Sequence, residues 1–145
     1  MNKKLLVCDL DNTLYDWVSY FVAAFYAMVD EAVRVTGCDR ERLLDDLRTV
    51  HRYHHDSEHP FSLLETEMVQ VLFPGQSKKE IARRLDSAFH AFNASRKENL
   101  RLYPGVRGAL EALSRSGITI VAHTESKLYS VVDRLTRLGL VDFFS

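Results

Sequence analysis

The chain has 145 residues, of which 46% are apolar and 27% charged, and its formal net charge is -1. These values are typical of a globular domain with a sizeable core, and the near-neutral charge gives no electrostatic reason to expect a nucleic acid or an anionic membrane as partner. Cys8 and Cys38 are the only cysteines, which favours reduced thiols in a cytoplasmic protein over a disulfide framework. The most apolar stretch, 18–29, is shorter than the roughly 20 residues that cross a bilayer, so we expect a buried helix there.

The first predicted element is a short buried strand over residues 3–9, which ends in two carboxylates. Asp9 and Asp11 stand two positions apart in the segment Asp9-Leu10-Asp11-Asn12-Thr13. Ligands of open parallel sheets bind at the carboxyl ends of the strands. Two carboxylates at such a place can divide the roles of nucleophile and proton donor and attract a divalent cation. The simpler alternative is a polar turn, in which Asp, Asn and Thr are common.

Four helices are predicted next, in a region without a second convincing strand. Asp39 is a good N-cap, and Ser77 with Glu80 forms a capping box. The four helices cover residues 16–35, 39–53, 61–72 and 77–95. This region is too long for one crossover between strands, and we expect an inserted helical domain.

The pattern returns to alternating helix and strand after Pro104-Gly105. A helix over 106–115, a strand over 118–122 and a helix over 127–138 follow, and residues 140–145 resemble the lead-in to another strand. This order predicts a parallel α/β sheet. The expected organisation is an α/β core made of 1–15 and 98–145, with a helical domain of 16–97.

Thr124 directly follows the second predicted strand. Adjacent parallel strands would place it beside Asp9, where its hydroxyl can donate to a phosphoryl oxygen. The amide after it lies near the start of a helix, where anions are favoured. His123 is expected either to line the same pocket or to serve in hydrogen-bonded packing.

These segments resemble the motifs of the haloacid dehalogenase superfamily. Val7-Cys8-Asp9-Leu10-Asp11-Asn12-Thr13-Leu14 is similar to the first motif, Asp-x-Asp-x-Thr after an apolar strand. Thr124 resembles the second motif, and Tyr103-Pro104-Gly105-Val106 resembles the segment that leads from the cap back into the core. The resemblance implies a Rossmann-like parallel-sheet core with an inserted all-helical cap.

The resemblance also implies a mechanism, that of a magnesium-dependent phosphatase. Asp9 would attack phosphorus and form an aspartyl-phosphate, and Asp11 would protonate the leaving oxygen and then activate water. Mg²⁺ would bind the Asp9 carboxylate and the Asp11 main-chain carbonyl. Thr124, Leu10 and Glu125 would bind the phosphate of a small phosphorylated metabolite. An Asp at the second position fits phosphatases and phosphomutases, whereas dehalogenases lack a carboxylate there. No oligomeric state is indicated.

Aromatic residues at the start of the first helix have two interpretations. In capped relatives this region overhangs the active site, so Trp17, Tyr20 and Phe21 would contact the leaving group of the substrate. Aromatic residues at helical spacing are more often part of a core. Both interpretations stay open for these three residues.

The later motifs of the superfamily, a Lys or Arg and an acidic cluster that binds magnesium, have no counterpart in this sequence. Lys127 lies in the first turn of a helix, where we expect it to face solvent. We therefore expect the 145 residues to be part of a longer phosphatase. The alternative is a catalytically inactive fragment or an interaction module of a haloacid dehalogenase-like protein.

A histidine-rich stretch covers residues 51–59. His and carboxylate side chains are zinc ligands, but their spacing here matches no closed zinc motif. A solvated loop at the end of a cap helix is the favoured interpretation. An intermediate interpretation is a loop that faces the active site and helps to select the substrate.

Overall fold

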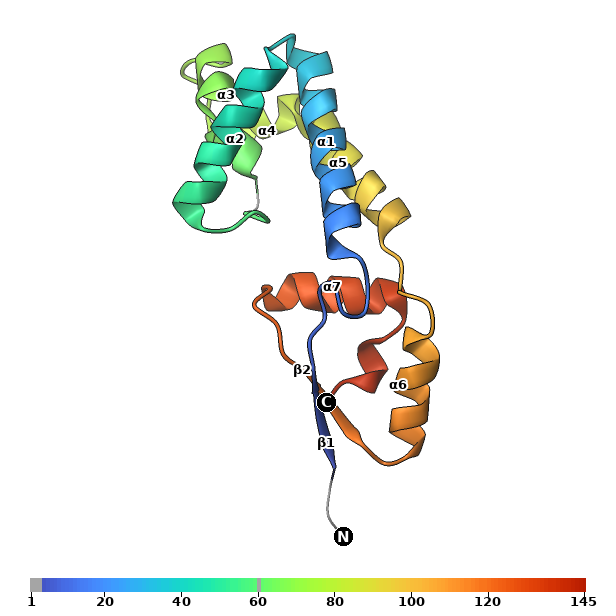
Figure 1. The fold of residues 1–145 in the computed structure, drawn as a ribbon. Coiled ribbons are helices and arrows are strands. Elements are labelled where there is room, and N and C mark those ends of the chain that lie inside the picture. Colours follow the sequence, from blue (N-terminus) through green and yellow to red (C-terminus); the bar gives the residue numbers. More distant parts are fainter. Residues whose placement is uncertain (1–3, 60) are drawn as a thin grey trace. The chain divides into compact units, whose positions relative to one another are not determined.

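The computed structural model describes residues 4–59 and 61–145 (Figure 1). The chain divides into two compact units. One runs to Phe21 and resumes at Lys97, and the other covers Val22–Arg96. The division falls inside the first helix, several residues later than the boundary expected at residue 15, because the first turn of that helix packs in the α/β unit.

The α/β unit is built on two parallel strands, as the sequence predicts. Strand β1, Leu5–Cys8, pairs with β2, Thr119–Ala122, so that Leu5 lies opposite Thr119 and Cys8 opposite Ala122. Helix α6, Val106–Arg115, precedes β2, and helix α7, Leu128–Leu138, follows it. Gly139 ends α7 with a φ of 64°, a left-handed conformation that glycine adopts without steric cost.

The last residues extend the sheet by a single bridge. A 3₁₀ turn, η2, covers Val141–Phe143. Phe144 then pairs with Ile120 of β2 in the parallel sense, and the Ser145 amide donates to the Ile120 carbonyl at 2.9 Å. The expected lead-in to a strand is therefore present, although a helical turn comes first.

The core of the α/β unit joins the carboxylate motif to both helices. Its fully buried members include Leu10, Tyr15, Ile120 and Leu140. The prediction of a buried strand over 3–9 is wrong in its burial, because only one face of β1 packs: Leu5 and Val7 are 62% and 58% exposed, whereas Leu6 and Cys8 pack against the core.

The second unit is all helical. Its elements are α1, Trp17–Thr36, which begins in the other unit; α2, Arg40–His54; the 3₁₀ turn η1, Ser62–Glu65; α3, Glu67–Leu72; α4, Lys78–Arg84; and α5, Asp86–Asn99. Asp39 caps α2 by accepting from the Arg42 amide, and the capping box of Ser77 and Glu80 is present. Leu43, Leu47 and Val50 of α2 are buried, as amphipathic spacing requires.

Two of the predicted helices are interrupted. The helix expected over 61–72 is a 3₁₀ turn followed by α3, because Thr66 is extended and its hydroxyl caps the new helix by accepting from the Val69 amide. The helix expected over 77–95 is split into α4 and α5 at Leu85, which is fully buried in the core of the unit.

The apolar segment 18–29 lies within α1, where Ala24 and Val29 are fully buried. None of the helices in residues 4–59 and 61–145 combines the length and apolar character that crossing a membrane requires.

Candidate active site

The two carboxylates of the first motif lie at the carboxyl end of β1. The ladder between the strands extends one step past β1, because the His123 amide donates to the Cys8 carbonyl at 2.8 Å. Asp9 comes next and is exposed, while the Asp11 side chain is 24% exposed. The carboxylates therefore reach solvent at the end of the sheet where the sequence predicts a site.

A tight turn fixes the backbone around these carboxylates. The Leu10 carbonyl accepts from the amides of Thr13 and Leu14 at 3.2 and 2.9 Å. Asn12 has a φ of 58°, a left-handed conformation that Asn tolerates better than most residues. Its side-chain oxygen accepts from the Trp17 amide at 3.0 Å and so caps the start of α1.

The Asp9 carboxylate is held by one neighbour in the turn. The Thr13 hydroxyl donates to Asp9 Oδ2 at 3.1 Å. No other hydrogen bond to this carboxylate is found among the residues that the structure describes. Thr13 thus orients Asp9 and leaves it accessible.

Three donors converge on Asp11. Tyr15 OH donates to Oδ1 at 2.6 Å, and Arg134 Nη1 lies 3.4 Å from the same oxygen. The Ser126 hydroxyl donates to Oδ2 at 2.8 Å. Ser126 follows β2 and is 115 positions away in the chain, so this contact joins the segments after the two strands.

Arg134 is a buried cation at the centre of this network. It lies in α7 and is 1% exposed, and its Nη1 donates to Tyr20 OH at 2.9 Å. Burial and the hydrogen bond to Asp11 raise the pKa of Tyr15 well above its ordinary value, so the phenol stays protonated as a donor. A buried charge is tolerated where it is paired and hydrogen-bonded, as Arg134 is here.

The predicted phosphate-binding residues lie on the same strand ends. Thr124 is partly buried, and its hydroxyl oxygen accepts from the Ser126 amide at 3.1 Å. Glu125 and His123 are exposed, whereas the Leu10 side chain is fully buried. Any contact of Leu10 with a phosphate would therefore be through its main chain.

The three aromatic residues differ in their surroundings. Trp17 and Phe21 are partly exposed and stack on each other, with ring centroids 4.8 Å apart and planes 7° apart. Tyr20 is 1% exposed in the core of the α/β unit. Its bond to Arg134 makes it a support of the network around Asp11.

The sequence alone did not identify Thr13, Tyr15, Ser126 or Arg134 as parts of the site. A signal for Arg134 does exist: it occupies the apolar stripe of α7 between the buried residues Val131 and Leu135, a position where an arginine requires a partner. Ser126 has no comparable signal, because its partner comes from the other end of the chain.

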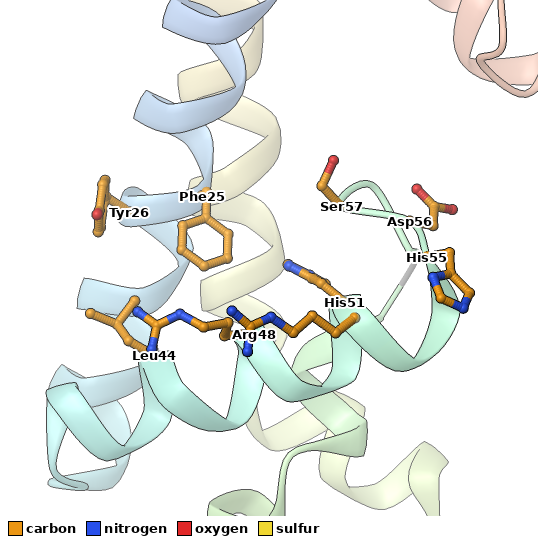
Figure 2. Close-up of a pocket in the computed structure, with 9 residues that line it drawn as sticks. Phe25, Tyr26, Leu44, Arg48, His51, His55, Asp56 and Ser57 are labelled. Atoms are coloured by element: carbon orange, nitrogen blue, oxygen red, sulfur yellow. The ribbon is translucent and has the colours of Figure 1, made fainter.

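A separate pocket lies within the helical unit, between α1 and α2. Its volume is about 410 Å³, and it is lined by Phe25, Tyr26, Leu44, Arg48, His51, Arg52, His55, Asp56 and Ser57. Figure 2 shows Phe25 and His51 facing each other across it, and their ring centroids are 5.8 Å apart. Neither Asp9 nor Asp11 lines this pocket.

No protein-family model and no curated protein sequence matches the chain. Solved structures do match it. A 2-haloacid dehalogenase from Pseudomonas syringae pv. tomato DC3000 is 24% identical, with a TM-score of 0.62 over 99% of this chain and 62% of the other. A putative beta-phosphoglucomutase from Thermotoga maritima is 22% identical, with a TM-score of 0.60, and the match covers 98% of this chain and 59% of the other.

A haloacid dehalogenase-type phosphatase from Thermococcus onnurineus is 20% identical, with a TM-score of 0.58 over 99% of this chain and 60% of that one. The chain therefore spans about 60% of the length of these structures. These three proteins are named for different reactions, so the likeness concerns the fold and leaves the chemistry to be argued from the site. The chain has the α/β fold of the haloacid dehalogenase-like hydrolases, with a helical insertion after the first strand.

Proposed function

We propose that the protein to which this chain belongs is a magnesium-dependent phosphomonoesterase that uses Asp9 as its nucleophile. The observation that carries the proposal is the hydrogen bond of 2.8 Å between Ser126 and Asp11, which brings the segments after β1 and β2 to one place. An accessible carboxylate, a second carboxylate held by donors, and a hydroxyl at the adjacent strand end are three of the groups that phosphoryl transfer uses.

The donors at this place fit a hydrated magnesium ion. Mg²⁺ prefers oxygen ligands, keeps several waters and is commonly held by one or two carboxylates together with a substrate phosphate. The accessible Asp9 carboxylate suits this role. The resemblance to the haloacid dehalogenase motifs implies that the second ligand would be the Asp11 main-chain carbonyl, and the three donors around the Asp11 carboxylate are compatible with that role. The ion would supply positive charge opposite the transferring phosphoryl group.

In the first step, an Asp9 carboxylate oxygen attacks phosphorus, and the bond between phosphorus and the ester oxygen breaks. The leaving oxygen takes a proton from Asp11, which must be in its acid form for this step. We assign Oδ2 to proton transfer because its partner, the Ser126 hydroxyl, can rotate away, whereas Tyr15 and Arg134 hold Oδ1. The products are an aspartyl-phosphate and the free alcohol.

In the second step, water attacks the phosphorus of the aspartyl-phosphate. Asp11 accepts a proton from that water, so it returns to its acid form, and the bond between phosphorus and Asp9 breaks. Inorganic phosphate leaves and the Asp9 carboxylate is restored. Thr124 would orient the phosphoryl oxygens in both steps through its hydroxyl, and the Glu125 amide would add a second donor.

The substrate proposed is a small phosphorylated metabolite. The exposed His123 and the stacked pair of Trp17 and Phe21 are the residues we propose for contact with its leaving group. Asp11 favours a phosphatase or a phosphomutase over a dehalogenase. Both cysteines, Cys8 and Cys38, are free, which supports the proposed cytoplasmic location.

Hydrolysis of an aryl phosphate in the presence of Mg²⁺ tests this function. We expect Asp9→Asn to abolish turnover, because an amide is a poor nucleophile toward phosphorus, and we expect a chelator to do the same. Asp142→Asn is the matched control, since Asp142 is an exposed carboxylate of the same unit, and it should retain the wild-type rate.

Turnover that persists in Asp9→Asn would exclude Asp9 as the nucleophile. A folded wild-type chain without turnover would mean that these 145 residues hold only part of the catalytic machinery, and absence of turnover in the longer protein as well would favour the alternative function, an interaction module without activity of its own. Circular dichroism of each sample establishes that it is folded.

A further inference from the structure

The histidine-rich stretch is a solvated loop only in part, because Arg52, Tyr53, His55 and Ser57 are exposed but the other residues of 51–59 are partly buried. His54 and His59 are partly buried, and each approaches the same carboxylate, that of Glu65 in η1. His54 Nε2 lies 2.7 Å from Glu65 Oε2, and His59 Nε2 lies 3.4 Å from Oε1. Among the residues that the structure describes, these three form the one group of ligand-type side chains whose donor atoms all lie within 4.8 Å of one another.

We propose that His54, His59 and Glu65 bind a divalent transition-metal ion of the zinc class, with a fourth position open to water. Two imidazoles and one carboxylate are a ligand set that Zn²⁺ accepts, whereas Mg²⁺ prefers a set made of oxygens. Tetrahedral ligands at about 2.0–2.2 Å from zinc are roughly 3.3–3.5 Å apart. Small side-chain movements bring the three donor atoms to that spacing.

Both rings present the same nitrogen to Glu65. The rings of His54 and His59 stack with centroids 3.5 Å apart and planes 9° apart, and the Nε2 atom of each ring faces the Glu65 carboxylate. A metal binds the unprotonated nitrogen of a neutral imidazole. The ion would therefore replace the two contacts between the Nε2 atoms and Glu65, with each ring carrying its proton on Nδ1.

Two of the three side chains come from regular elements of the helical unit. His54 is in the last turn of α2, and Glu65 follows the buried residues Leu63 and Leu64. The loop between them is braced by Asp56, which accepts from the Glu58 amide at 2.9 Å and whose carbonyl accepts from the His59 amide at 3.3 Å. A bound ion would therefore connect the end of α2 to η1 and close the loop between them.

One neighbour would oppose the metal. Lys78 Nζ lies 3.3 Å from Glu65 Oε1, and its side chain is 70% exposed. The ammonium group competes with a metal cation for the same oxygen, but it can swing into solvent. Removal of this charge should therefore strengthen metal binding, the opposite of what removal of a ligand should do.

Calorimetric titration of the full chain with ZnCl₂ tests the proposal, with tag-free protein freed of metal by a chelator. We expect one Zn²⁺ per chain and no comparable binding of Mg²⁺ at this site. His54→Gln and His59→Gln should each weaken zinc binding by at least about tenfold. Loss of a residue that only hydrogen-bonds to a metal ligand already lowers metal affinity by about 10–100-fold, and loss of the ligand itself should lower it at least as much. Lys78→Gln should bind zinc more tightly than the wild type.

Two control variants separate this site from others. His90→Gln removes an exposed histidine that pairs with Asp86 and should bind zinc as the wild type does. Asp142→Asn removes an exposed carboxylate of the α/β unit and should also bind zinc normally. The zinc titration needs no phosphatase activity, so failure of the proposed function and failure of this site are distinguishable. If a ligand variant fails to fold, two measurements still test the metal site. One is zinc binding by Lys78→Gln. The other is the visible spectrum of the Co²⁺-loaded wild type, which is intense for tetrahedral and weak for octahedral coordination.

The proposal is overturned if the wild type binds no zinc. It is equally overturned if the folded ligand variants bind zinc as tightly as the wild type, if Lys78→Gln binds it more weakly, or if bound Co²⁺ gives an octahedral spectrum.

Discussion

The two units of the chain have cores of different character. The helical unit is centred on fully buried apolar side chains, among them Leu43, Leu47, Leu63 and Ile81. The α/β unit instead places a buried arginine and two buried tyrosines beside the Asp11 carboxylate. Buried polar groups are costly unless they are paired, so the core of the α/β unit depends on the hydrogen bonds and the ion pair around Asp11, whereas the core of the helical unit depends on apolar packing.

The largest expected effect is on the apolar core of the helical unit. Leu43 is fully buried in α2, and Leu43→Ala leaves a cavity. We expect the free energy of unfolding to fall by about 2–5 kcal/mol, measured by urea denaturation.

Val71→Ala is the matched control, because Val71 is 62% exposed in the same unit. It should change stability by less than about 0.5 kcal/mol. Equal losses in the two variants would contradict the apolar core described for this unit.

An intermediate effect is expected for the polar core of the α/β unit. Arg134→Met removes the cation beside Asp11 and the hydrogen bond that Arg134 Nη1 donates to the buried Tyr20 hydroxyl. We expect a loss of about 1–3 kcal/mol in the free energy of unfolding. Phosphatase activity should fall by about 10–100-fold. A positioned acid or base contributes about 10²–10⁴-fold to a rate, and loss of Arg134 should remove only part of that contribution.

The leaving group distinguishes a positioning role of Arg134 from a purely structural one. Alkyl phosphates depend on protonation by Asp11 more than aryl phosphates do, so Arg134→Met should impair their hydrolysis more. Arg137→Met is the control, since Arg137 is an exposed residue of α7 that pairs with Asp133. An equal loss for both substrate classes would argue against the positioning role.

The smallest expected effect is a dependence of stability on pH in the helical unit. Burial lowers the pKa of His51 below its ordinary value of 6.5. The unfolded chain therefore binds a proton more readily than the folded one, and stability falls as the pH drops below 6.5 toward the folded-state pKa. His51→Gln should flatten this dependence in urea titrations on either side of pH 6.5, while His90→Gln should not.

Local patterns in the sequence predicted most of the fold. The apolar run before Asp9, the caps at Asp39 and Ser77, and the stripe on α2 each specify their element through neighbours a few residues away. The break at Leu85 was not predicted, because burial in the core of the unit overrides a continuous helical pattern. Tertiary packing of this kind has no local signature.

The candidate site was predictable only in part. The placement of Asp9 and Asp11 follows from the strand that precedes them, since a strand and its end are local features. The donors Ser126 and Arg134 come from the other end of the chain, and their contacts with Asp11 depend on how β1, β2 and α7 pack together. His59 and Glu65 are similarly brought together by the 3₁₀ turn η1, which stands where the sequence predicted the first part of a continuous helix over 61–72.

The most direct test of the central claim is to trap the covalent intermediate in Asp11→Asn. With an aryl phosphate the leaving group needs no proton, so Asp9 should still be phosphorylated, whereas the amide cannot activate water for the second step. Mass spectrometry of the intact and digested chain should find one phosphoryl group, labile to hydroxylamine, on Asp9. Absence of the adduct in folded protein, or its location on another residue, would contradict the assignment of Asp9 as the nucleophile.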